Sequence, residues 1–139
     1  MINLQGKSVL VTKSGHQGKA LSREIDYRGG RSVFCPMIKI VGSKAEDTAR
    51  NVAKNIESYD FAIFISRNAV RYGLKILAEV QKELPQMPIY AVGPGTAMEL
   101  KLAGVEGVRF PYAPHSSEGL LRLEGLRAES LIGRHAVIF

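Results

Sequence analysis

The sequence holds one cysteine and no long apolar run, and each shortage excludes a class of protein. The lone Cys35 cannot form a disulfide within the chain, which favours a reducing compartment such as the cytoplasm. Because Cys35 lies in an apolar run beside Pro36, we expect its thiol to be buried and unreactive. No apolar run approaches the roughly 20 residues of a membrane-spanning helix, and residues 1–7 lack the basic-then-apolar plan of a secretion signal. We therefore expect a cytoplasmic protein without a membrane partner.

The motifs of several enzyme classes are missing as well. The sequence has neither a Gly-Lys-Ser/Thr phosphate loop nor a Gly-x-Ser-x-Gly nucleophile elbow. His16, His115 and His135 fall in separate predicted elements, without the spacing of metal ligands. No pair of carboxylates follows a predicted strand, so acid–base and nucleophilic catalysis lack candidates and the catalytic residues stay unassigned.

The charge is unbalanced toward the basic side. Lysine and arginine number 19 against 13 acidic residues, a net charge of +6, which favours an anionic partner. The basic residues are scattered and form no tract or aromatic-studded patch, so we expect no nucleic-acid partner. A small polyanionic ligand fits this pattern, and charge that serves only solubility stays an alternative.

The most informative stretch is residues 61–70. The apolar run of residues 61–65, between Asp60 and Ser66, predicts a strand buried on both faces. The polar residues Ser66, Arg67 and Asn68 follow at once, and apolar residues then recur at helical spacing. Open α/β sheets bind ligands where strands end in this way, and the first N–H groups of a helix favour anions.

The same order of strand, turn and helix recurs along the chain. Further strands are predicted over residues 8–12, 32–35, 89–92, 108–110 and 135–139, and helices follow most of them. Patterns typical of a capping box at residues 43–46 and 96–99 predict two helix starts, and residues 116–126 predict one more helix. Strands alternating with helices predict an α/β fold with a parallel sheet, flanking helices and right-handed crossovers.

Polar donors gather at three predicted helix starts. Gly93-Pro94-Gly95 invites a dinucleotide-binding interpretation, but Met98 stands where the third glycine would be needed. What remains is a tight turn before a helix, which is either structural or an anion contact. The other donors are Ser66, Arg67, Asn68, Thr96, Ser116 and Ser117. Each could be an ordinary N-cap, whereas three sets at one sheet edge favour binding.

Four segments resemble uroporphyrinogen-III synthases. Residues 9–13, Val-Leu-Val-Thr-Lys, resemble the opening Val-Leu-Val-Thr-Arg strand of that family, and residues 64–70 resemble its Phe-Thr-Ser-x-Asn-Ala-Val stretch. Residues 91–97 are similar to its Ala-Val-Gly-x-x-Thr-Ala turn, and residues 116–121 to its Ser-x-Gly-Leu-Leu segment. The four occur in order at plausible spacing across nearly the whole chain.

The resemblance implies a lyase of tetrapyrrole (heme) biosynthesis. Such an enzyme cyclises the polycarboxylate hydroxymethylbilane to uroporphyrinogen III, with loss of water and inversion of the last pyrrole ring. The family needs no metal or organic cofactor, and the full-length protein is expected to be a monomer. A non-catalytic flavodoxin-like domain that binds an anion or signals is the alternative. A receiver domain would need an acidic pair where Thr12 and Lys13 stand.

The resemblance also implies two similar flavodoxin-like α/β domains that face each other across a cleft. Residues 1–36 would be the opening strand–helix–strand piece of a discontinuous first domain, and residues 37–139 would be most of the second. The sequence ends in a predicted buried strand, and family members run to nearly twice its length. We therefore expect a truncated chain that is inactive by itself, and its unpaired strand edges suggest dimers as a hypothesis.

The residues expected to bind substrate carboxylates follow from the matching motifs. They are Thr12, Lys13, Ser66, Arg67, Asn68, Gly95, Thr96 and Ser117. Thr12 and Lys13 would face the others from the first domain. Two departures from the family pattern affect this site: Ile65 replaces a threonine, and Lys13 replaces an arginine and so loses its planar fork.

Overall fold

The computed structural model describes residues 3–41 and 46–139, with the side chain of Glu46 excepted. The chain divides into two compact units, Met1–Ser43 and Lys44–Phe139. The capping box expected at residues 43–46 lies outside the described residues, and the domain boundary expected after residue 36 stays a prediction.

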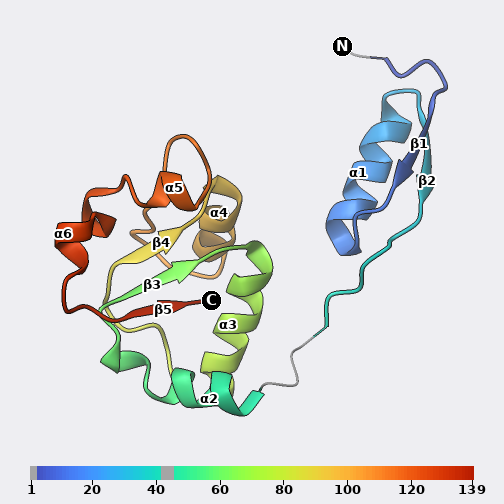
Figure 1. Cartoon of the computed structure of the whole chain (residues 1–139). Helices are drawn as coiled ribbons and strands as arrows, with labels where there is room; N and C mark the ends of the chain where they lie inside the picture. Colours follow the sequence, from blue (N-terminus) through green and yellow to red (C-terminus); the bar gives the residue numbers. More distant parts are fainter. Residues whose placement is uncertain (1–2, 42–45) are drawn as a thin grey trace. The chain divides into compact units, whose positions relative to one another are not determined.

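The first unit is one strand–helix–strand motif (Figure 1). Strand β1 (Ser8–Val11) pairs in parallel with β2 (Arg31–Phe34), and helix α1 (Gly15–Tyr27) connects them. The parallel pairing requires such a crossover connection, and α1 covers one face of the two strands. Val11 and Ile25 are buried, whereas Leu10 is 62% exposed. The unit therefore has a small core and leaves apolar strand residues in contact with solvent.

Cys35 corrects an expectation from the sequence. Its backbone N–H donates to the carbonyl of Val11 at 2.9 Å, which continues the pairing beyond β2, yet the side chain is exposed. The buried thiol predicted from the apolar neighbourhood is therefore wrong. An apolar run buries a side chain only where a second layer covers it, and within the described part of this unit α1 is the only helix.

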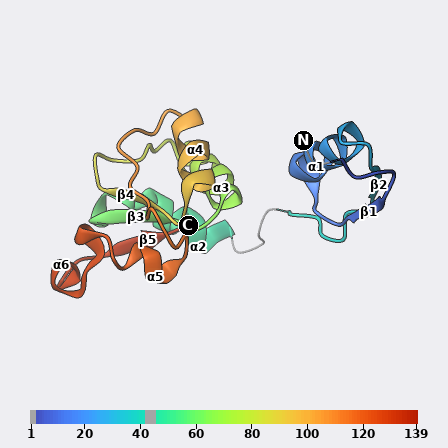
Figure 2. The ribbon, with the colours of Figure 1, turned by 90° about the horizontal axis from the view of Figure 1, so that it is seen from above.

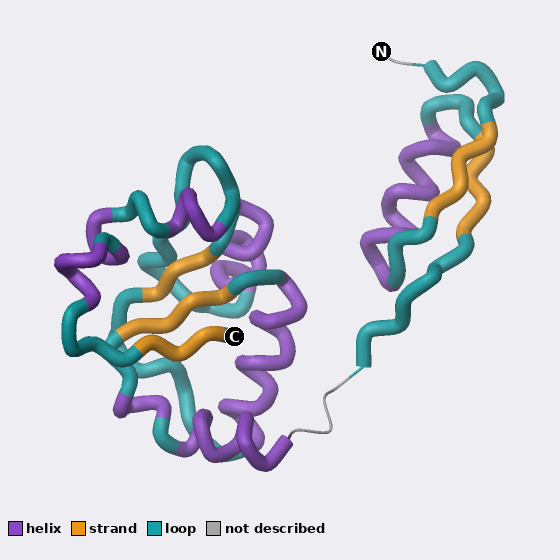
Figure 3. Tube along the Cα trace, in the orientation of Figure 1, coloured by secondary structure: helices purple, strands orange, loops and turns teal. Residues whose placement is uncertain are grey.

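The second unit contains a parallel sheet in the order β4–β3–β5. Its strands are β3 (Phe61–Phe64), β4 (Ile89–Ala91) and β5 (Ala136–Ile138). The strand expected over residues 108–110 is reduced to an isolated bridge between Arg109 and Tyr90. The predicted α/β fold with a parallel sheet and flanking helices is confirmed, and Figure 3 shows the strands beside the helices in both units.

Helices cover both faces of this sheet. Figure 2 shows α3 (Arg67–Glu79) and α4 (Pro94–Leu102) on one side of the strands and the short α5 (Ser117–Leu120) and α6 (Ala128–Leu131) on the other. Helix α2 (Glu46–Lys54) packs against α3, and 3-10 turns occupy Ile56–Ser58 and Glu124–Leu126. The helix expected over residues 116–126 is therefore broken into short pieces.

Two apolar clusters form the core of the second unit, one on each face of the sheet. The larger contains Phe64, Val70, Leu77 and Leu100, each at most 1% exposed. The smaller joins Phe61 and Tyr90 to Leu120 and Leu126. Since strand residues alternate between the faces, neighbouring residues of β3 enter different clusters. This two-sided burial confirms the prediction for Phe61–Phe64. Ile65, the last residue of the predicted strand, lies beyond β3 and is 56% exposed.

Candidate functional site: the helix starts at the carboxyl edge of the sheet

The carboxyl ends of β3 and β4 lie at one edge of the sheet, and α3 and α4 begin there (Figure 1). Ser66 is the N-cap of α3, and its Oγ accepts a hydrogen bond from the backbone N–H of Ala69 at 3.0 Å. A cap of this kind satisfies one of the unpaired donors of the first turn. Asn68 is half-buried in the same turn. The sequence placed this helix start correctly because the cap and the apolar periodicity are both local.

Arg67 joins the starts of α3 and α4. Its Nε donates a hydrogen bond to the carbonyl of Gly95 at 3.2 Å. A Cβ built on Gly95 would lie 2.7 Å from Nη2 of Arg67, so a side chain here would displace the guanidinium. Arg67 is exposed. A guanidinium has several N–H donors in a planar fork, and those not used on Gly95 can bind a carboxylate.

His115 brings a third segment to this edge. Gly93 is the N-cap of α4, and a Cβ built on it would lie 3.1 Å from the Cβ of His115. The Nδ1 atom of His115 is 3.1 Å from the carbonyl oxygen of Pro111, which holds the ring on its own loop. The sequence predicts no role for His115, a histidine without the spacing of a metal ligand. His115 and Gly93 are 22 residues apart in the chain and approach each other only in the folded structure, so no local sequence pattern indicates their proximity.

Ser116 and Ser117 follow His115 at the start of α5. Ser116 is the N-cap, and its Oγ accepts from the N–H of Gly119 at 3.3 Å. The hydroxyl of Ser116 also holds the pKa of the Glu118 carboxyl below its usual range. Ser117 is exposed as the first residue of the helix. Ser116 thus has a structural role, and Ser117 is the serine left at the surface.

Thr96 does not cap α4, which corrects the capping box expected at residues 96–99. The helix begins earlier, at Pro94, because proline suits the first turn, where its missing N–H is not needed. Thr96 is 5% exposed and its N–H donates to the carbonyl of Gly93 at 3.1 Å. Glu99 pairs instead with Arg71 of α3 at 2.7 Å, which raises the pKa of Arg71 and ties the two helices together.

Thr12 and Lys13 lie in the first unit, between β1 and α1. Both are exposed, and the carbonyl of Thr12 accepts from the N–H of Met37 at 3.1 Å. They precede Ser14, the N-cap of α1, so Ser14 and not either of them holds the position that Ser66 has at the start of α3. The structure therefore brings together the helix starts that carry Ser66, Arg67, Gly95 and Thr96. The segment with His115 and Ser117 lies at the same edge. Thr12 and Lys13 belong to the other unit.

Two further properties bear on the class of protein. Among residues 3–41 and 46–139, no group of three or more His, Cys, Asp or Glu side chains could hold a metal ion. Over the same residues, no helix is long and apolar enough to cross a bilayer. The fold and this edge define an α/β protein that presents basic and backbone donors where its strands end.

Comparison with known proteins identifies the family within that class. Residues 19–138 match the family model described as uroporphyrinogen-III synthase HemD. The chain therefore belongs to the uroporphyrinogen-III synthase family, as its motifs predict.

Individual relatives agree with this assignment. A uroporphyrinogen-III synthase of Proteus mirabilis is 27% identical over 121 residues, which cover 86% of this chain and 61% of that protein. One of Escherichia coli K12 is 28% identical over 133 residues, 94% of this chain and 53% of that protein. One of Chlorobaculum parvum is 31% identical over 103 residues, 71% of this chain and 40% of that protein. The chain spans about half the length of the curated relatives it matches.

Proposed function

We propose that this protein supplies part of a uroporphyrinogen-III synthase and binds hydroxymethylbilane at the helix starts described above. The reaction would close the linear tetrapyrrole to uroporphyrinogen III, release water and invert the last ring, as a lyase of heme biosynthesis in the cytoplasm. Family membership supports the reaction class. The observation that carries the site is Arg67, whose guanidinium lies across the start of α4 at Gly95.

The proposed site would act mainly by positioning the substrate. Hydroxymethylbilane carries several carboxylates, and helix N-termini and a guanidinium are donors that suit them. Its hydroxymethyl group leaves with help from the attached electron-rich pyrrole, so holding the chain folded is the main task of the protein. The proposed contacts in the second unit are Ser66, Arg67, Asn68, Gly95, Thr96 and Ser117, with Thr12 and Lys13 contributed by the first unit.

A titration tests the binding part of this proposal. Uroporphyrin, the oxidised polycarboxylate product, would be titrated calorimetrically into the whole chain. Arg67→Gln should weaken binding about fivefold, the effect of losing one exposed charge contact. Arg127→Gln is the matched control, because Arg127 is an exposed arginine just before α6, where the strands begin (Figure 1). An equal loss of affinity in both variants would show that only the net charge of the protein matters, and it would contradict the proposed site.

A coupled assay tests the reaction. Hydroxymethylbilane would be generated in place, and the cyclised product would be oxidised and resolved into type I and type III isomers. The present chain and a version extended to the length of its relatives would be run side by side. We expect type III from the extended form and only the uncatalysed type I from this chain. Type I alone from both would contradict the synthase and leave an anion-binding domain.

The oligomeric state belongs to the same proposal. We expect the extended protein to be a monomer and this chain to self-associate through unpaired strand edges. Within the described residues β1 pairs only with β2, and Leu10 on it is 62% exposed. Light scattering that shows a compact monomer of this chain at high concentration would contradict self-association.

A further inference from the structure

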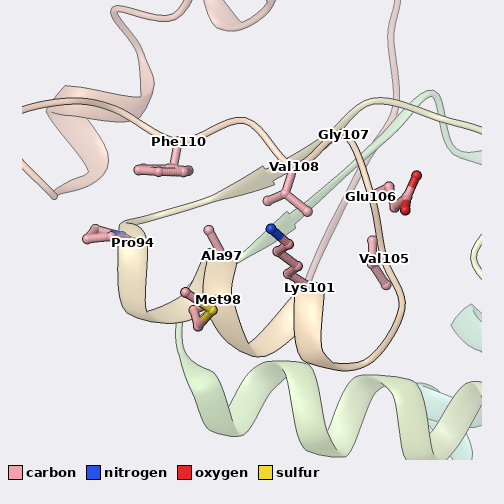
Figure 4. A pocket seen from close by; sticks show the side chains of 9 residues that line it. All are labelled: Pro94, Ala97, Met98, Lys101, Val105, Glu106, Gly107, Val108 and Phe110. Carbon is pink, nitrogen blue, oxygen red and sulfur yellow. The ribbon is translucent and has the colours of Figure 1, made fainter.

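A concave site lies beside α4, lined by residues other than Arg67 and Gly95. A pocket of about 480 Å³ opens between this helix and the chain segment that follows it (Figure 4). Helix α4 contributes Pro94, Ala97, Met98 and Lys101, and the following segment contributes Val108 and Phe110. The four helix residues are spaced three and four apart, so they form one stripe along α4. The pocket is therefore built by a regular helix face and the bridge-forming segment around Arg109.

The walls of this pocket are mainly apolar. Met98 is 57% exposed and Phe110 is 41% exposed, so both offer surface to a ligand and not only to the core. Figure 4 shows the Phe110 ring and Pro94 at one end of the pocket, with Met98 below them. An aromatic ring and a thioether contact planar apolar ligands favourably. Pockets that bind small ligands have volumes of roughly 300–1,000 Å³, and this one lies within that range.

Lys101 supplies an exposed charge at the pocket that no carboxylate of the described residues pairs with. Its amine points toward Val108, among the apolar side chains (Figure 4). Across residues 3–41 and 46–139, no carboxylate forms an ion pair with Lys101, although other lysines of the chain have such partners. Glu106 also lines the pocket, but its carboxylate is turned away from the amine. An ammonium beside apolar walls favours a ligand that brings its own negative charge.

We propose that this pocket binds a planar aromatic or heteroaromatic molecule that carries one carboxylate. The ring would lie against Met98 and Phe110, and the carboxylate would accept hydrogen bonds from the Lys101 amine. This site shares no proposed contact with the hydroxymethylbilane site, so it stands or falls independently of the proposed synthase function. It would give the protein a second ligand, bound between α4 and the segment that follows it.

Indole-3-acetate is the probe, titrated into the ¹⁵N-labelled whole chain while backbone amide shifts are followed by NMR. We expect saturable shifts at residues 95–101 and 105–110, since Pro94 has no amide proton. Lys101→Met should weaken binding about fivefold, and the neutral indole-3-acetamide should bind the unmodified chain more weakly by a similar factor. The matched control is Lys54→Met, because Lys54 also lies in the last turn of a nine-residue helix, α2. This control should bind the probe as the unmodified chain does.

A second variant keeps the test decisive if Lys101→Met disturbs the fold. Met98→Glu places a carboxylate at an exposed position of the same stripe and should repel the probe without removing Lys101. The absence of saturable shifts around the pocket would overturn the proposal. Equal losses of probe affinity in Lys54→Met and Lys101→Met would also overturn it, because they would show that only the net charge of the protein matters.

Discussion

The two units share a strand–helix–strand arrangement and differ in how many faces of their strands are covered by helices. Each has a strand that ends in a polar turn, a 13-residue helix and a parallel return strand. In the second unit helices lie on both faces of the sheet, and Phe64 at the end of β3 is 0% exposed. In the first unit Phe34 at the end of β2 is 38% exposed. A similar local pattern thus gives only a small core around Val11 and Ile25 in the first unit and a two-sided core where helices lie on both faces of the sheet.

The helix starts show the same difference. Ser66 caps α3 through its side chain, whereas Ser14, the N-cap of α1, makes no such hydrogen bond. The turn after β3 is also fixed by a neighbouring helix start, through Arg67 and Gly95. The comparison teaches that the turn after a strand gains a contact from outside its own helix where a neighbouring helix begins beside it.

The largest expected effect is a difference in stability loss when a phenylalanine is removed from each unit. Phe64→Ala should lower the free energy of unfolding of the second unit by about 3–5 kcal/mol, because it leaves a cavity and removes the stack on Phe139. Phe34→Ala should cost about 1 kcal/mol, since that side chain is partly in water already. Urea unfolding followed by circular dichroism measures both. Similar losses for the two variants would contradict the difference in burial.

Removing the caps tests the helix starts. Ser66→Ala should lower the free energy of unfolding by about 1 kcal/mol, because the N–H of Ala69 loses its acceptor. Ser14→Ala should change it little, since Ser14 makes no side-chain cap bond. Thermal unfolding of the two variants provides the measurement, and a larger loss for Ser14→Ala would reverse the ranking of the two units.

Gly95→Ala tests whether the start of α4 acts on the ligand through Arg67. The added methyl group would displace the guanidinium of Arg67, so uroporphyrin should bind about fivefold more weakly. In the Arg67→Gln background the same substitution should have no further effect. A full additional loss in that background would show that Gly95 acts independently of Arg67. Calorimetric titration of the four proteins completes the cycle.

The smallest expected effect is a pH dependence. Lys82 donates to Glu57 at 2.6 Å and holds the pKa of that carboxyl below its usual range. A lowered carboxyl pKa stabilises the folded chain above the unfolded pKa, and this contribution is lost as pH falls through the folded value. NMR titration of the Glu57 carboxyl should give the lowered pKa, and Lys82→Met should restore it. If the pKa of Glu57 stays lowered in Lys82→Met, a cause other than Lys82 is responsible for the shift.

The sequence predicted the local elements well and their surroundings less well. The strand predicted at residues 61–65 and the cap at Ser66 depend on neighbours in the chain, and the structure has the cap and a strand over Phe61–Phe64, one residue shorter than predicted. The capping box at residues 96–99 and the buried Cys35 were wrong. In both cases the outcome depends on residues distant in sequence. Glu99 pairs with Arg71 of α3, and the described residues of the first unit leave the Cys35 side chain exposed.

The site shows the same limit. Polar donors after strands could be found by inspection, because a parallel sheet collects its carboxyl ends at one edge. The contacts of His115 with Gly93 and of Arg67 with Gly95 could not be found in this way, since they join segments more than 20 residues apart.

The sequence by itself determined the α/β plan, the family and the segments that end at the sheet edge, because periodicity, caps and motifs are local properties. Tertiary structure alone decided which residues are buried, which donors meet across the edge and that a pocket forms beside α4. Those outcomes depend on packing between elements, and packing is set by the layers that surround each strand and not by the strand's own residues.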